Sequence, residues 1–382
     1  MEKITIGLIS APELPTDVAR KLLHELPGEL HNNIEKSASF SIELEIDPLV
    51  GAAENVDDTI KGALKRKKDQ AWDFVICLTD LPIFSGKDVV VADASISDGF
   101  AQISVPAFGS LPIRKRVRNG IVQMVKELYE PKAKNEITKR KDLFQRQFPF
   151  STLKRKTPGN HEDNVDVRFV ISPRYTGKIR LVSGMTLANR PWTALGSFQK
   201  VLALAFATGS YISIFKTPWQ LSVAYSLERF VMLMVVALLS MIAWVIFAHD
   251  LWEKPTTKGD KRLRRLYNRT TFLTLGVTVL MNYFVLAGMF LGAIAIFVSP
   301  ELFQAFTGLE EQPDIGYYLQ LAWLVTSLGT LTGAIGAGLE NESVIKDITY
   351  GYRQKRRSNE IQEGEIEARD QYVYDRNKQG SN

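Results

Sequence analysis

The sequence predicts an α/β sandwich domain at the N-terminus, followed by an all-α transmembrane bundle of four helices. Almost all of the long hydrophobic runs lie between residues 195 and 339, whereas the first 130 residues alternate strand-like and helix-like patterns of apolar side chains. The chain of 382 residues has a formal net charge of +5, which suits a protein that works against an anionic membrane leaflet. The expected domains are an α/β domain at 1–130, a basic connector at 131–192, a transmembrane domain at 193–340 and a polar tail at 341–382.

The first 130 residues are expected to form one α/β domain. In chain order we expect strands at 4–9, 40–46 and 73–78 with helices at 16–35 and 56–70 between them, then strands at 89–92 and 100–105 and a helix at 114–130. Pro27 and Gly28 should bend or break the first helix. This order of elements predicts a layered α/β fold whose first strands are parallel.

A ligand of this domain is expected beyond the carboxyl ends of the parallel strands, where open α/β sheets have their crevice. The polar side chains near those ends are Ser10, Asp80 and Asp93. We expect them to form a ligand-binding site, although the same residue types are also ordinary turn formers. A membrane-tethered hydrolase is a further hypothesis, which requires Asp80 and Asp93 to share one cleft. The first turn, ISAPELP, has two prolines where a phosphate-binding loop needs backbone amides, so a dinucleotide or P-loop function is disfavoured.

The sequence contains no catalytic or metal-binding motif. The single cysteine, Cys77, lies in the apolar run FVICL and is expected to be a small buried side chain. The four histidines, His24, His31, His161 and His249, are scattered along the chain. We therefore expect no metal and no cofactor, and we favour a protein that is not an enzyme.

The connector combines many basic residues with Phe144, Phe148 and Phe150. One interpretation is a peripheral segment whose phenylalanines insert at the level of the lipid headgroups while the basic residues meet anionic lipid. A solvated linker is the second interpretation. Nucleic-acid binding is the least favoured, because no recognised nucleic-acid-binding fold accompanies the charge.

Four residues near the ends of the expected helices are typical of a membrane interface. Tryptophan is enriched at that depth, and arginine there can meet lipid phosphate. An expected strand at 166–172 and an amphipathic element at 178–189 lead to this region. The predicted interface residues are Arg190, Trp192, Trp219 and Trp252.

The four spans are expected at about residues 196–215, 227–248, 271–298 and 317–339. The second and third are long and apolar enough to cross a hydrocarbon core of about 30 Å. The fourth is less apolar, because Gln320, threonines and glycines dilute it, but it carries no charge. The first carries Lys200, so its composition alone fits either a span or an interfacial helix.

The charges of the connecting loops decide between these two options. The loop at 249–269 is rich in Lys and Arg, whereas the loop at 300–316 has acidic residues and no basic ones. The positive-inside rule therefore places the first loop in the cytoplasm, and the head can be cytoplasmic only if 196–215 also spans. With no signal peptide to export the head, we expect a multi-pass protein of the cytoplasmic membrane with both termini in the cytoplasm.

Small and polar residues inside the spans predict how the helices pack. Gly288 and Gly292, and Gly329 and Gly333, are spaced four residues apart, which allows close helix approach within the bundle or in a dimer. Asn282 lies at mid-depth and should face the bundle, where its amide can find a partner. No ionisable residue occupies the middle of a span, which disfavours a proton-coupled transporter.

Two family resemblances accompany these patterns. The order of DFVICLTDLPIF, VVVADASISDGFAQISV and a helix opening near Arg114 resembles the archaemetzincin-type zinc peptidases. That family carries His-Glu-x-x-His on the corresponding helix, where this chain has RKRVRNGIVQMVKELYE, so the resemblance implies a zincin-like fold without its metal site. The stretches GMTLANRPW, ALAFATGSY, AHDLWE, GAIGAGLE and TYGYR are similar to those of uncharacterised membrane proteins of Gram-positive bacteria, a resemblance that implies a cytosolic head with four spans and no particular activity.

We therefore predict a multi-pass membrane protein that acts as a membrane-anchored binding or regulatory module. The expected partners are the lipid bilayer with its anionic headgroups and a cytosolic protein, with a homo-oligomer as a further option. The alternative is a small channel or transporter subunit that uses the glycine-lined helices.

Overall fold

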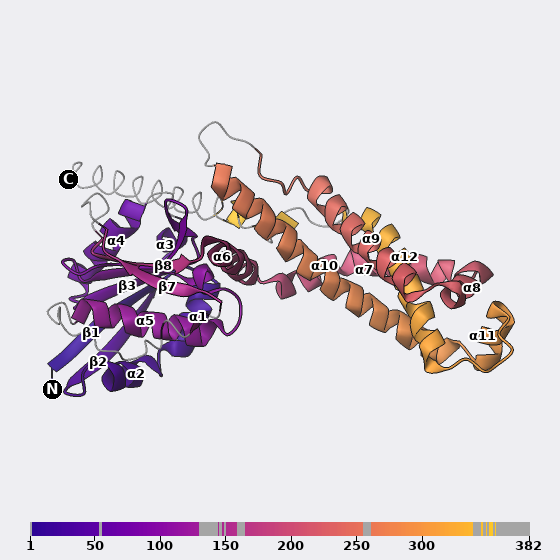
Figure 1. Cartoon of the computed structure of the whole chain (residues 1–382), viewed down its shortest axis with the longest axis horizontal. Coiled ribbons are helices and arrows are strands. Elements are labelled where there is room, and N and C mark those ends of the chain that lie inside the picture. Colours follow the sequence, from indigo (N-terminus) through magenta and orange to yellow (C-terminus); the bar gives the residue numbers. More distant parts are fainter. Residues whose placement is uncertain are drawn as a thin grey trace, which may run out of the picture. The chain divides into compact units, whose positions relative to one another are not determined.

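The computed structural model describes residues 2–52, 56–129, 144, 147–148, 150–158, 165–254, 261–338, 345–346, 349, 351–353 and 356. The chain divides into two compact units, Met1–Ala188 with Tyr352–Asn382, and Asn189–Gly351. The first unit holds a β-sheet with helices on both faces, and the second is helical (Figure 1). The coarse prediction of an α/β region followed by a helical region with three to four apolar helices is confirmed.

The first unit is built on an eight-stranded sheet with the order β2-β1-β3-β6-β5-β8-β7, in which β4 pairs with β5. Its strands are β1 (Glu2–Ser10), β2 (Ala38–Ile46), β3 (Phe74–Thr79), β4 (Ile83–Ser85), β5 (Asp88–Ser95), β6 (Phe100–Ser104), β7 (Thr152–Lys156) and β8 (Val167–Ser172). β1 is parallel to β2 and β3, as expected for the first strands, and the remaining pairs except β3 with β6 are antiparallel. Because β2 and β3 lie on opposite sides of β1, the strand order reverses there, and the crevice for a ligand is expected between β1 and β3.

Helices cover both faces of this sheet. They are α1 (Leu14–Leu22), α2 (Leu26–Asn33), α3 (Leu49–Ala52), α4 (Val56–Asp69), α5 (Ile113–Tyr129) and α6 (Arg174–Ala188), with a 3-10 turn, η1 (Val105–Phe108). Ile9 and Cys77 form one core with Val50 of α3 and Ala63 of α4. The alternate side chains of the strands point to the other face, where α1, α2 and α5 lie (Figure 1).

The helix expected at 16–35 is in fact two helices, α1 and α2. Pro27 stands in the first turn of α2, where its missing N–H costs no hydrogen bond. The expected break is therefore real, and it lies just before the proline.

The α/β unit extends to Ala188, well beyond the boundary expected at residue 130. β8 pairs with β5, and β7 pairs with β8, so part of the expected connector completes the sheet. Phe144 and Phe148 are 3% and 2% exposed and pack with Phe108 and Phe169 at ring-centroid distances of 5.6–6.0 Å. Their insertion among lipid headgroups was a wrong prediction, because burial against the sheet removes them from any surface. Residues 130–143, which hold much of the basic run, and most of the tail expected at 341–382 lie outside the described residues.

The second unit contains the membrane-length helices. Its elements are η4 (Pro191–Phe198), α7 (Gln199–Ile212), α8 (Lys216–Ala224), α9 (Leu227–Ala248), α10 (Lys261–Phe297), α11 (Pro300–Thr307) and α12 (Ile315–Ala337). Within the described residues, α9, α10 and α12 are each long and apolar enough to cross a membrane. The expected span at 196–215 falls mainly on α7, which has 14 residues and passes as a membrane span only together with α8, and the two helices meet at a bend of 91°. The pair is either a broken fourth span or a re-entrant loop.

Close helix packing in this unit depends on small residues of α7 and α12. A Cβ atom at Gly333 of α12 would lie 2.7 Å from the Cβ of Ala205 in α7, and one at Gly329 would lie 2.8 Å from the carbonyl oxygen of Ala205. A Cβ atom at Gly209 of α7 would likewise clash with the ring of Phe290 in α10. Larger side chains at these positions would separate the helices.

Candidate functional site

The carboxyl ends of β1 and β3 lie side by side and carry buried polar residues. Ser10 is the last residue of β1 and lies opposite Leu78 of β3, while Asp80 follows the last residue of β3. Ser10 is 0% exposed and Asp80 is 1% exposed. The structure therefore brings two of the three predicted ligand-binding residues to the same sheet edge, but it buries both.

The polar groups at this edge make hydrogen bonds within the turns. The Ser10 and Thr16 hydroxyls lie 2.8 Å apart, and Thr16 Oγ1 donates to the Ala11 carbonyl oxygen at 2.7 Å. Thr79 Oγ1 donates to the Val50 carbonyl oxygen at 2.7 Å and accepts from a backbone amide two residues further on. Their role as turn formers is thus fully visible in the structure.

Asp93, the third predicted residue, belongs to a different place in the sheet. It lies in β5 opposite Gln102 of β6, so two strand spacings, about 10 Å, separate its strand from β3. Its carboxylate accepts two hydrogen bonds from the guanidinium of Arg168 in β8, at 2.8 and 2.9 Å. The hypothesis of one cleft formed by Asp80 and Asp93 is therefore wrong, because a cross-strand ion pair holds Asp93 within the sheet.

The C-terminal segment reaches the edge of β1 through a buried arginine. Arg353 is 4% exposed, forms an ion pair with Glu13 in the turn between β1 and α1, and donates to the carbonyl oxygen of Ala188 at 2.9 Å. Arg356 Nη2 also lies 3.8 Å from the Glu13 carboxylate. The Glu13 carboxylate, just after β1, thus lies close to the guanidinium groups of Arg353 and Arg356.

Glu13 has an unusual backbone conformation, with φ of 67° and ψ of −122°. Positive φ is a strained state for a residue with a Cβ, and such strain is often found where a side chain has a task. The strain is maintained here at the residue that binds Arg353. This combination makes the Glu13–Arg353 ion pair the strongest candidate for a functional contact in the α/β unit.

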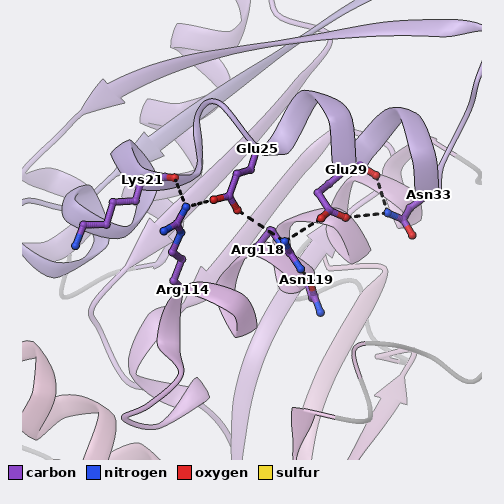
Figure 2. A network of polar contacts seen from close by, with 7 residues as sticks. All are labelled: Lys21, Glu25, Glu29, Asn33, Arg114, Arg118 and Asn119. Atoms are coloured by element: carbon purple, nitrogen blue, oxygen red, sulfur yellow. Dashed lines mark hydrogen bonds and ion pairs between the residues drawn. The ribbon is translucent and has the colours of Figure 1, made fainter.

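A second ion-pair network joins α5 to the two helices before β2. Arg114 pairs with Glu25 and donates to the Lys21 carbonyl oxygen at 3.2 Å, while Arg118 pairs with Glu29 at 2.8 Å. Figure 2 shows these side chains arranged in one chain of contacts from α1 to the end of α2. The basic first turn of α5 is therefore largely engaged within the α/β unit.

The buried thiol of Cys77 is not prepared for chemistry. Burial raises its pKa far above the ordinary value, and the nearby Asp47 charge acts in the same direction. A thiol of this kind is protonated at neutral pH and hardly nucleophilic. Among the residues that the structure describes, no group of three or more His, Cys, Asp or Glu side chains could hold a metal ion.

The glycines expected to pack helices fall into two groups. Gly329 and Gly333 pack against α7 as described above. Gly288 and Gly292 of α10 are exposed, and a Cβ at either would meet no atom within 4 Å. These two glycines therefore do not mediate packing within the bundle.

Asn282 faces the bundle as expected and is 5% exposed. Its Nδ2 donates to the Thr278 carbonyl oxygen of its own helix at 2.9 Å, whereas its Oδ1 has no hydrogen-bond partner among the described residues. A buried acceptor without a hydrogen bond is costly.

The predicted interface tryptophans also differ from one another. Trp192 and Trp252 are 44% and 47% exposed, which suits an interface position. Trp219 is 5% exposed and packs between Phe303 and Phe306 of α11, and its indole N–H donates to the Ser213 carbonyl oxygen. Trp219 therefore packs α8 against α11, and its burial leaves little of the side chain to contact lipid. Arg190 stands just before η4 with φ of 52°.

The fold and the site together define a protein class: an α/β unit joined to a helical unit with three to four membrane-length helices. No family model, no curated protein and no solved structure matches this chain. The resemblances to archaemetzincins and to the Gram-positive membrane proteins therefore stay predictions.

Proposed function

We propose that this chain is a membrane-anchored binding or regulatory module of the cytoplasmic membrane. The apolar helices hold the protein in the bilayer, and the α/β unit binds a cytosolic partner at the carboxyl edge of β1. The C-terminal segment closes that edge until the partner displaces it.

The Glu13–Arg353 ion pair is the observation that carries this proposal. It lies next to the point where the strand order reverses, which is the usual ligand position in parallel α/β sheets. Since Arg353 follows α12 in the chain, a partner that displaces it acts on a residue that is covalently linked to the membrane unit. Binding at the head would in this way be coupled to the membrane unit through the chain itself.

The chemistry of the edge indicates the partner. A group that replaces Arg353 must satisfy the Glu13 carboxylate, which already attracts two arginines. A cationic group meets this requirement best, because it keeps the carboxylate paired. We therefore propose a basic segment of a cytosolic protein as the ligand.

Cysteine-accessibility mapping tests the anchoring and the side of the membrane. Single cysteines at Thr217, Lys254 and Gln312, all exposed, are introduced in a Cys77→Ala background and labelled with an impermeant maleimide. We expect labelling from outside at Thr217 and Gln312, and labelling at Lys254 only after permeabilisation. Labelling of Thr217 only after permeabilisation would contradict four spans and a cytosolic head.

A small channel or transporter subunit is a second candidate. It is favoured by the bend of 91° between α7 and α8 together with the buried Asn282, whose Oδ1 accepts no hydrogen bond from the part of the chain that the structure describes. Transporters often bind substrates where helices are interrupted. This candidate predicts solute flux in liposomes that changes on Asn282→Leu, and liposomes that stay tight would remove it.

A further inference from the structure

The α/β unit has an apolar surface that is exposed among the residues the structure describes. Tyr175 and Ile179 of α6 are 66% and 69% exposed, and Phe150 in the turn before β7 is 94% exposed. Tyr175 and Ile179 are one helical turn apart and so share a face. Ser151 Oγ donates to Thr176 Oγ1 at 2.9 Å, which holds the Phe150 turn beside the start of α6.

Basic side chains alternate with these apolar ones. Arg174 and Lys178 also stand one turn apart on α6, each next to one of the exposed apolar residues. Asp88 accepts from both Arg174, at 2.6 Å, and Lys156, at 2.8 Å, so this contact retains one net positive charge. No carboxylate among the described residues forms an ion pair with Lys178. We call Phe150, Arg174, Tyr175, Lys178 and Ile179 the α6 surface.

This composition fits the boundary between lipid headgroups and acyl chains. Aromatic and aliphatic side chains insert there, while lysine and arginine keep their charges at the phosphates. A solvated helix face would not need three large, highly exposed apolar side chains in one place. A nucleic-acid groove would favour charge over aliphatic contact, and Ile179 serves no such purpose.

α6, which carries this surface, is the last helix before the candidate membrane unit in the chain. α6 ends at Ala188, and the unit with the membrane-length helices begins at the next residue. Arg174 is 14 residues before Ala188, a helical distance of about 21 Å. So short a tether gives the α6 surface a high effective concentration at any bilayer that holds the apolar helices.

We propose that the α6 surface docks on the anionic bilayer in which the protein is anchored. Phe150, Tyr175 and Ile179 insert at the headgroup boundary, and Arg174 and Lys178 contact lipid phosphates. This inference rests on the proposed function, because docking requires a chain that is anchored in the membrane.

Quenching by spin-labelled lipid in nanodiscs tests the docking. The full-length protein is reconstituted with phosphatidylcholine, with or without phosphatidylglycerol, and a fluorophore is attached to Phe150→Cys or, in a second variant, to Ile179→Cys. The buried Cys77 stays unlabelled. Ile46→Cys, which is 42% exposed on β2 at the opposite end of the sheet, is the matched control, and Phe247→Cys, 86% exposed on α9, reports insertion of the bundle.

We expect quenching at positions 150, 179 and 247 in phosphatidylglycerol nanodiscs, and none at position 46. Lys178→Glu changes the surface charge by two and should lower the ratio of docked to undocked protein about 30-fold. If position 247 is quenched while positions 150 and 179 stay unquenched, as position 46 does, the docking is overturned and the anchoring remains intact. Absence of quenching at 247 would overturn the proposed function and the docking with it. If quenching at positions 150 and 179 is the same with and without phosphatidylglycerol, and is unchanged by Lys178→Glu, the role of anionic lipid is refuted.

Discussion

Replacing Glu13 by glutamine tests whether its ion pair with Arg353 holds the C-terminal segment on the α/β unit. Glutamine keeps the size of the side chain and an acceptor oxygen, so the variant removes mainly the charge. The side chain of Arg353 is 5% exposed and that of Glu13 is 24% exposed, so solvent screens the pair only in part. A hydrogen bond to a charged group contributes about 1.5–3 kcal/mol and a neutral one about 0.5–1.5 kcal/mol, and the midpoints of these ranges put the loss at about 1.3 kcal/mol.

A loss of that size corresponds to a roughly tenfold larger population of the released segment. Trypsin cleavage after Arg353 measures this population, because a protease cuts the transiently opened state. The fragment that ends at Arg353 is quantified by mass spectrometry at low protease concentration. We expect cleavage about ten times faster in Glu13→Gln than in the parent protein.

Glu25→Gln is the matched control, because it also removes a carboxylate that two arginines approach. It should leave cleavage after Arg353 unchanged, since Glu25 belongs to the network between α2 and α5. Equal cleavage in the parent and Glu13→Gln would refute the reasoning, and equal acceleration in both variants would show general destabilisation instead.

Three further predictions follow from the described contacts. Gly333→Leu should lower the free energy of unfolding by about 1–3 kcal/mol and lower the melting temperature of the protein in detergent, because the new side chain meets Ala205. Gly288→Leu should have little effect, since a Cβ atom there would meet no other atom within 4 Å. Equal shifts in melting temperature for the two variants would contradict the packing. Cys77 should resist iodoacetamide at pH 8 in the folded protein and react fully in denaturant, as followed by intact mass; rapid labelling of the folded protein would contradict its burial. Hydrogen bonds from Lys156 and Arg174 hold the pKa of Asp88 below its ordinary value. The stability that Asp88→Asn removes should therefore be present above about pH 4 and vanish as the pH falls through the folded-state pKa of Asp88. A difference in melting temperature between Asp88→Asn and the parent protein that persists in acid would contradict this linkage.

The order of strands and helices in the first unit could be predicted, because each element has a hydrophobic period of its own. β1, β2 and β3 are apolar or alternating runs separated by amphipathic helices, and that pattern almost dictates a parallel start to the sheet. The short β4 escaped prediction, because three residues are too few to show a period. β7, Thr152–Lys156, has one buried residue among charged ones and resembles a loop.

Sequence patterns also fail where two environments favour the same residues. Phenylalanines among basic residues are expected both on an exposed surface and in a core that borders a charged strand; Phe144 is buried, whereas Phe150 is exposed. Gly288 and Gly333 share the same spacing pattern, yet one is open and the other is in close contact. Only the neighbouring helix decides between these outcomes, and local sequence does not contain it.

The candidate site was predicted only in part. Ser10 and Asp80 could be placed at one sheet edge, since strand ends are visible in the sequence. Glu13 and Arg353 could not be found, because 340 positions separate them and neither belongs to a motif. The only local signal near Glu13 is a turn with two prolines, which does not reveal a partner.

The length of α10 has a mechanical consequence. As one continuous helix of 37 residues it measures about 56 Å, whereas a hydrocarbon core measures about 30 Å. In the proposed membrane protein, the apolar span begins at residue 271, so the first ten residues of α10, about 15 Å of helix, project beyond it, with Lys261, Arg262, Arg264 and Arg265 at the N-terminal end. Such a projection acts as a lever: a change in tilt of about 10°, well within the range of membrane helices, moves its tip by about 3 Å. Small changes in bilayer thickness would thus be converted into displacements that a protein surface can detect.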